Sequence, residues 1–204
     1  MLRKQIALSK PALSTLVLVE SDLTIALSLA QKRFYDFIFE IANKFSILDR
    51  SGPLQVIDIG SGDGRVWPSF GALARNNLSL QGIEIEPGAK NSMRQRAKAV
   101  RASFGAKFGI VIANAENLKS IKGIHKTADC ITILHPFMGG QAENTTSLSL
   151  QLKSAYQNLR PGGIIVMTHF TKTEFLAGRS ACGNLPVINA GRNRHSIGRS
   201  SHNR

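Results

Sequence analysis

The chain has 204 residues, 43% of them hydrophobic, so it is long enough for one well-buried domain with extensions. It contains no run of 18 or more apolar residues and only two cysteines, which argues against a membrane span and a disulfide framework. The two cysteines also lack the spacing of metal ligands, so we expect no metal site. A formal charge of +13 favours partners that are polyanions or acidic protein surfaces.

The first 19 residues contain no acid and combine basic residues with serine, leucine and alanine. Such a composition could form an organelle transit peptide. A ragged basic terminus is the simpler interpretation. We therefore expect a cytoplasmic protein, with a mitochondrial location as the alternative.

Residues 22–46 carry apolar side chains at steps of three and four, which predicts one long helix. Its inward stripe should include Phe34, Phe37, Ile38 and Ile41. Tyr35 and Phe39 fall off this stripe, so they should line an acceptor cleft or be partly exposed. We expect the helix to pack beside the sheet and cover the cofactor cleft.

The next segment, residues 56–64, is an apolar strand that runs into Gly60, Gly62 and Gly64. Because glycine has no Cβ, such a turn can adopt positive φ and let the backbone approach a ligand closely. A helix that begins near Gly64 would direct its unpaired N–H groups at an anionic group.

About twenty residues later a second apolar strand ends in Glu84. A carboxylate at this spacing can accept hydrogen bonds from both hydroxyls of a ribose. The glycine turn and this acid together predict a nucleoside-containing cofactor that lies across the carboxyl ends of two parallel strands.

Strands and helices continue to alternate along the chain. We expect strands over 54–59, 79–84, 108–112, 129–134 and 163–169, helices over 64–75, 88–103 and 143–158, and a short turn or helix over 116–122. Pro161, Gly162 and Gly163 should end the last helix and begin the fifth strand. This order predicts an α/β fold, a doubly wound, mostly parallel, Rossmann-like sheet with the first strand in its centre.

The glycine spacing with its leading acid, Asp58-x-Gly60-x-Gly62-x-Gly64, resembles motif I of the class I S-adenosylmethionine-dependent methyltransferases. Four further segments resemble the same family in the same order: 82–87, 114–118, 128–134 and 159–166. The match covers roughly residues 50–170. It implies a seven-strand, Rossmann-like methyltransferase with S-adenosylmethionine as its cofactor.

The resemblance also implies which residues bind the cofactor. The glycine turn would face the methionyl part, and Asp58 would reach its ammonium through backbone or water contacts. Glu84 would bind the ribose hydroxyls, and Asn114, where the family commonly has Asp, would meet the adenine amino group with its side-chain carbonyl. The full predicted set is Asp58, Gly60, Ser61, Gly62, Gly64, Glu84, Asn114 and Ala115.

Methyl transfer in this family takes place beside the end of the fourth strand, where this chain reads Leu134-His135-Pro136-Phe137. Adenine- and glutamine-directed enzymes resemble one another in an Asn/Asp-Pro-Pro-Tyr/Phe tetrapeptide at this place. Leu-His-Pro-Phe lacks the Asn or Asp that holds the target amino group, which disfavours those acceptors. His135, Pro136 and Phe137 are the candidate catalytic residues. His135 could act as a base or could only shape the cleft with Phe137.

Residues 58–65 and 82–84 are also similar to Dot1-type and related protein lysine methyltransferases, which implies a protein lysine as acceptor. RNA is the alternative acceptor. Residues 88–107 contain six lysines and arginines and no acidic residue, and residues 171–204 contain six against one acidic residue. Such segments can bind phosphate. A cofactor- or nucleic-acid-binding module without catalysis is the third possibility.

The C-terminal part departs from the family pattern. A complete sheet of this class has two more strands after the fifth, whereas residues 171–204 are rich in Gly, Ser, Asn and Arg. We expect the final strands to be missing or degenerate, residues 189–204 to be disordered, and the fifth strand to be an exposed edge through which chains associate.

The chain is thus predicted to have three parts. They are an N-terminal extension with the cleft-covering helix over 1–50, a cofactor-binding methyltransferase domain over 51–170, and a basic, disordered tail over 171–204.

Overall fold

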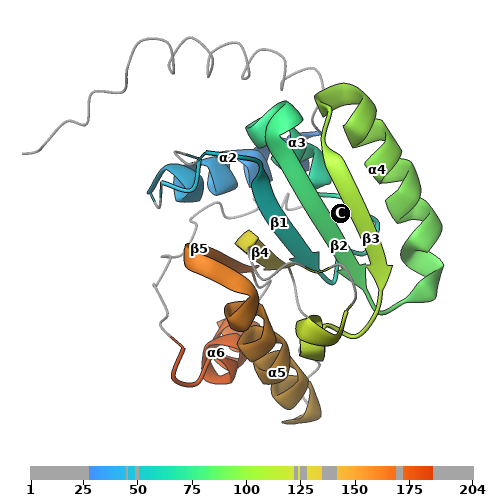
Figure 1. The fold of residues 1–204 in the computed structure, drawn as a ribbon. Coiled ribbons are helices and arrows are strands. Elements are labelled where there is room, and N and C mark those ends of the chain that lie inside the picture. Colours follow the sequence, from blue (N-terminus) through green and yellow to red (C-terminus); the bar gives the residue numbers. More distant parts are fainter. Residues whose placement is uncertain are drawn as a thin grey trace, which may run out of the picture.

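This computed structural model describes residues 28–44, 46–48, 51–121, 124, 128–134, 142–168 and 172–185. Their strands form one five-stranded sheet with helices on both faces (Figure 1). Within these ranges no helix has both the length and the apolar character that crossing a membrane requires.

The sheet is entirely parallel. Its strands are β1 (Leu54–Ile59), β2 (Leu78–Glu84), β3 (Lys107–Ile112), β4 (Ala128–Leu134) and β5 (Leu159–Thr168). They lie in the order β3-β2-β1-β4-β5, and each neighbouring pair is parallel. The predicted α/β class, the parallel sheet and the central first strand are confirmed.

The helices follow the predicted alternation. They are α2 (Leu29–Lys44), α3 (Trp67–Ala74), α4 (Lys90–Phe104), α5 (Ala142–Asn158) and α6 (Lys172–Ala181), with short 3₁₀ turns η1 (Arg75–Asn77), η2 (Pro87–Ala89) and η3 (Ala115–Ser120). Residues 22–27 of the predicted first helix lie outside the described ranges.

Side chains alternate across the sheet and divide the core in two. Val56 of β1 packs in a cluster with residues of α2, α3 and α4. Ile57 and Ile59 belong to a second cluster, with residues of η3, α5 and α6. Both faces of the central strand are therefore buried, as a doubly wound sheet requires.

Helix α2 presents the predicted stripe to the first of these clusters. Ile38 is 3% exposed, and Phe34, Phe37 and Ile41 are partly buried against it, so the prediction for the stripe is confirmed. The expectation for Tyr35 is wrong. This residue is buried and stacks on Phe39 at a ring distance of 5.8 Å, in a cluster with residues of α3 and α4.

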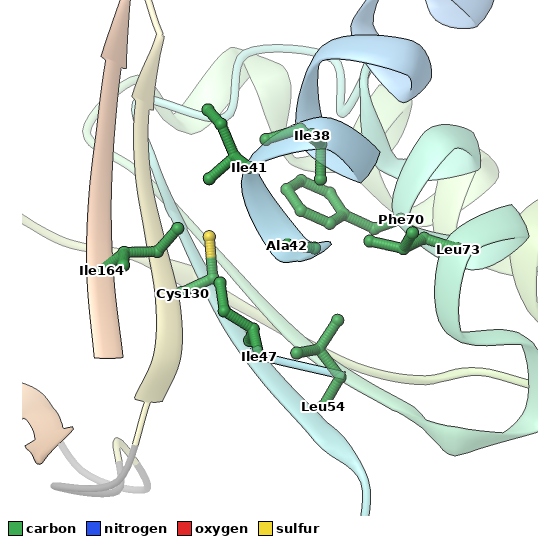
Figure 2. Close-up of a pocket in the computed structure, with 9 residues that line it drawn as sticks. All are labelled: Ile38, Ile41, Ala42, Ile47, Leu54, Phe70, Leu73, Cys130 and Ile164. Atoms are coloured by element: carbon green, nitrogen blue, oxygen red, sulfur yellow. The ribbon is translucent and has the colours of Figure 1, made fainter. Parts of the chain in front are cut away.

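A small cavity of about 10 Å³ lies beneath α2, in the region that Figure 2 shows. Its lining is apolar throughout and comes from five elements and one loop: Ile38, Ile41, Ala42, Ile47, Leu54, Phe70, Leu73, Cys130 and Ile164. A space of this size holds no more than a single water, and these walls offer it no partner. We interpret it as a packing gap in the core.

Two elements near the C-terminal end differ from the prediction. Strand β5 begins at Leu159 rather than residue 163, because the segment Pro161–Gly163 forms an irregularity within the strand, where pairing shifts from Ala128–Leu159 to Cys130–Ile164. Helix α6 occupies ten residues of the segment predicted as a disordered tail, so that prediction is wrong for Lys172–Ala181. Residues 189–204 lie outside the described ranges.

Candidate functional site

The predicted cofactor residues follow the carboxyl ends of three neighbouring strands. The glycine turn follows β1, Glu84 ends β2, and Asn114 follows β3. Because the strands are parallel, these ends lie at the same edge of the sheet (Figure 1). This edge is the candidate site.

The glycine turn is held against β2. The amides of Gly60 and Ser61 donate to the carbonyl of Ile83 at 2.9 and 3.2 Å. Gly60 and Gly62 have φ of +67° and +53°, which glycine adopts without strain. A Cβ on either would meet nothing within 4 Å, so the space in front of both is open to a ligand.

Gly64 plays a different part in the turn. Its φ is +69°, and a Cβ would lie only 2.7 Å from the ring of Trp67. A Cβ on Gly82 of the neighbouring strand β2 would overlap the same ring. In this structure Gly64 therefore makes room for a buried tryptophan rather than for a ligand.

The expected helix at Gly64 begins three residues later, at Trp67. A residue with positive φ does not fit a right-handed helix, so the glycine turn has to end first. The amide of Trp67 donates to the carbonyl of Gly64, that of Ser69 donates to Val66, and Pro68 has no N–H. The expectation that this helix directs several unpaired N–H groups at an anion is therefore wrong.

Asp58 is turned into the molecule and is 1% exposed. One carboxylate oxygen accepts from the indole Nε1 of Trp67 at 2.8 Å, and the other accepts from the hydroxyl of Thr132 at 2.6 Å. Burial raises the pKa of the Asp58 carboxyl, and these two hydrogen bonds oppose that rise. Its carboxylate thus joins β1, β4 and the start of α3, and a contact to the cofactor ammonium stays a prediction.

Ser61 also points inward. It is 9% exposed, and its hydroxyl donates to the backbone carbonyl of Asp58 at 2.6 Å. The side chain therefore fixes the turn to the end of β1. Any contact of Ser61 with the cofactor would come from its backbone.

Glu84 is 8% exposed and stands beside the glycine turn. Its Oε2 accepts from the amide of Gly62 at 2.7 Å. Its Oε1 accepts from the amides of Ile85 and Glu86 at 2.8 and 3.2 Å. The structure thus brings together the two features that the sequence assigned to the cofactor, the acid and the glycine turn.

Asn114 and Ala115 lie at the start of η3. The side-chain oxygen of Asn114 accepts from the amide of Glu116 at 2.9 Å and so caps this short helix. Asn114 itself is exposed, whereas Ala115 is 6% exposed and packs in the core. The Asn114 side-chain carbonyl keeps a second lone pair for adenine, and that contact stays a prediction.

Ile85 was not named from the sequence. It follows Glu84 directly and is 60% exposed, one of the few large apolar side chains among the described residues that are exposed. The available signal was its place between two glutamates, directly after the last residue of β2. His135, Pro136 and Phe137 lie outside the described residues, which end at Leu134 on this side. Their catalytic role stays a prediction.

Solved structures that are similar to this chain include the following three. TrmN from Thermus thermophilus is 18% identical with a TM-score of 0.52, over 69% of this chain and 40% of that one. The precorrin-6y C5,15-methyltransferase from Geobacter metallireducens GS-15 is 22% identical with a TM-score of 0.49, over 69% and 66%. The glycopeptide N-methyltransferase MtfA complexed with sinefungin is 17% identical with a TM-score of 0.49, over 65% and 48%.

This chain therefore spans at most 66% of the length of these three proteins. At such low identity the likeness to TrmN supports the fold alone. A search of the curated proteins found no match.

The family comparison goes further. The model of the ubiE/COQ5 methyltransferase family matches residues 23–183, well over half of the chain. The matched region includes the glycine turn, Glu84 and Asn114. The chain therefore belongs to the ubiE/COQ5 methyltransferase family, and its cofactor is S-adenosylmethionine, as the sequence predicted.

Proposed function

We propose that this chain transfers a methyl group from S-adenosylmethionine to a macromolecular acceptor, in the first place a lysine of a protein. Membership of a methyltransferase family supports the reaction. The observation that carries the proposal is the hydrogen bond of 2.7 Å between the Gly62 amide and Glu84 Oε2. It joins the open glycine turn and the buried acid at one place on the sheet edge.

The cofactor supplies a methyl group on a sulfonium, which an aligned nucleophile can displace in line. A carboxylate has about four lone-pair positions, and three of those on Glu84 receive backbone N–H groups here. Two ribose hydroxyls therefore fit only if one of these three N–H groups releases its hydrogen bond. We infer that the amide of Gly62 does so, because it belongs to the turn that faces open space, and that the glycine turn shifts when the cofactor binds.

Ile85 supports the same placement. Its exposed side chain offers an apolar surface next to the acid, where the flat face of the adenine can pack. Asn114 caps η3 at the end of the adjacent strand β3 and can bind the edge of the base. Together the three residues would hold the nucleoside part, while the glycine turn faces the methionyl part.

The acceptor would enter beside the end of β4, where His135, Pro136 and Phe137 follow Leu134 in the chain. A lysine attacks only as the neutral amine, and a desolvated cleft lowers its pKa toward that form. The charge of +13 favours an acceptor lysine that lies on an acidic surface.

RNA is the second candidate acceptor, and the observation that favours it is the row of exposed lysines and arginines on α4. Phosphate groups would bind such a row without any acidic protein surface. An RNA acceptor requires no change in the cofactor site.

The test is incubation of the protein with methyl-labelled cofactor and a cell extract, followed by protease or nuclease treatment. Label that only protease releases supports a protein acceptor, and label that only nuclease releases points to RNA. Glu84→Ala should reduce labelling, because it weakens cofactor binding. Glu86→Ala is the matched control, because this exposed neighbour donates only its backbone amide to Glu84. Wild-type protein that binds the cofactor yet labels nothing would overturn the enzymatic proposal.

A further inference from the structure

Four basic residues lie in a row along one face of α4: Lys90, Arg94, Lys98 and Arg101. Their spacing of four, four and three residues keeps them on one side of the helix. With a rise of about 1.5 Å per residue, the row is about 16 Å long. All four are exposed, while Met93, Ala97 and Val100 lie on the adjacent side of the helix and are buried in the core. We call these four residues the basic row.

No neighbouring acid neutralises the basic row within the part of the chain that the structure describes. Helix α4 itself contains no acidic residue. Its one ion pair with a described residue is made by Arg96, off the row, with Asp63 at 3.9 Å. None of the four basic residues of the row forms an ion pair with a described acidic residue. Among the described residues, therefore, no ion pair offsets the positive charge of the row.

We propose that the basic row binds the phosphate backbone of a nucleic acid. The exposed side chains beside it, Asn91 and Gln95, are amides of the kind that hydrogen-bond to phosphates and sugars. No large apolar side chain is exposed on α4. A helix that lies on a membrane needs such side chains to insert, and most protein interfaces use them as anchors.

The same face carries no exposed aromatic ring on which a base could stack. Binding should therefore depend on charge and salt rather than on base sequence. Figure 1 shows α4 on the outer side of the molecule, next to the edge strand β3. Lys90 follows Glu84 after the short η2, so the row begins near the cofactor edge.

This inference goes beyond the proposed function, since the row can hold a nucleic acid whichever group is methylated. It is tested by fluorescence anisotropy with a labelled single-stranded RNA of mixed sequence, and with the corresponding RNA duplex, as salt rises. Four neutralised phosphates give a salt slope of about −3 for a single strand, which is roughly a 50-fold loss of affinity between 50 and 200 mM. The two RNAs distinguish a single strand from a duplex as the preferred source of phosphate.

Replacing Lys90, Arg94, Lys98 and Arg101 together by glutamine should remove most of this slope. The glutamine substitutions should leave α4 helical, because glutamine has nearly the same helix propensity as lysine and arginine. Circular dichroism and binding of demethylated cofactor should match the wild type. A row variant that folds and still binds RNA with an unchanged slope would overturn the inference.

A matched control removes the same charge elsewhere. Glutamine at the exposed Arg33, Lys119, Lys153 and Arg179 also lowers the formal charge from +13 by 4, to +9. This control should keep the wild-type slope, and an equal loss in both variants would show that net charge alone binds RNA.

Two further outcomes are decisive. Vesicles of anionic lipid that bind through the row, while RNA does not bind, would also overturn the inference. Failure of RNA binding with intact cofactor binding leaves the proposed methyl transfer standing, because the two measurements are independent.

Discussion

Asp58 is an acid with almost no contact with solvent, and its neighbours explain how the fold tolerates it. Each oxygen accepts one hydrogen bond, from Trp67 or from Thr132. The raised pKa indicates that these bonds do not fully offset the cost of burial, and the charge of the nearby Glu84 adds to that cost. The carboxylate fixes three elements at the start of the glycine turn, so its position serves the site even without ligand contact.

The first prediction concerns Asp58→Asn. Because the folded-state pKa is raised above the ordinary 3.8, the stabilising contribution of Asp58 is present in acid and is lost as pH rises through the folded value. Asparagine has no charge to bury, can accept from Trp67 and can donate to the Thr132 hydroxyl. The stability of the variant relative to the wild type should therefore increase as pH rises above about 4. Urea unfolding at several pH values measures this, and a constant difference would contradict it.

The second prediction concerns the acid at the end of β2. Glu84→Ala should weaken binding of S-adenosylmethionine or its demethylated product by about 1–3 kcal/mol, through lost ribose hydrogen bonds. Glu86→Ala should bind like the wild type, since its side chain is exposed. Isothermal calorimetry compares the three proteins. Equal affinities would remove Glu84 from the cofactor site.

The elements show where sequence patterns suffice. Four of the five strands were predicted to within one residue of their observed bounds, because apolar residues recur along each of them. The exception is β5, which begins four residues before its predicted start. The role of Trp67 was not predicted, because its partners Asp58, Gly82 and Phe108 are brought to it only by the folded sheet. The burial of Tyr35 was not predicted for the same reason. It depends on contacts with α3 and α4, which the periodicity of α2 alone does not reveal.

The missed helix α6 is a case of tertiary stabilisation. Its sequence is polar, and ten residues alone form only a marginal helix. Ala177, Ala181 and the following Leu185 pack into the cluster of α5. The cofactor residues were more predictable than α6, because glycine spacing and an acid at the end of a strand are local signals in the sequence. The inward orientation of the Asp58 side chain has no such local signal and was not predicted.

The third prediction separates two glycines of one turn. Gly62→Ala should lower stability by only about 1–2 kcal/mol, from positive φ alone, because its Cβ would enter open space. Gly64→Ala should cost more, since the added Cβ meets the ring of Trp67, whose side chain is fully buried. Cofactor affinity should show the reverse order, with Gly62→Val blocking binding in a folded protein. Thermal unfolding and calorimetry together check both orders, and a larger stability loss at Gly62 would contradict the assignment.

At the scale of the whole molecule, the two edges of the sheet differ in charge. Strand β3 begins at the exposed Lys107 and runs beside the basic row of α4, so two copies would repel each other there. Strand β5 contains the apolar run Ile164–Met167, and the charge of Arg160 is paired with Asp129. Within the described residues no further strand pairs with β5. Its edge is therefore the better template for another chain.

The last prediction is that the protein associates through β5 as its concentration rises. Light scattering should show a mass above that of one chain of 22.1 kDa at high concentration. Hydrogen exchange should then show increased protection of the amides of β5 and unchanged protection of β3, which serves as the internal control. High salt should not abolish the association, because backbone hydrogen bonds and apolar contacts, rather than charge, hold such an edge. A single-chain mass at every concentration, with identical exchange at β5, would mean that this edge is covered in solution and that the exposed-edge interpretation is wrong.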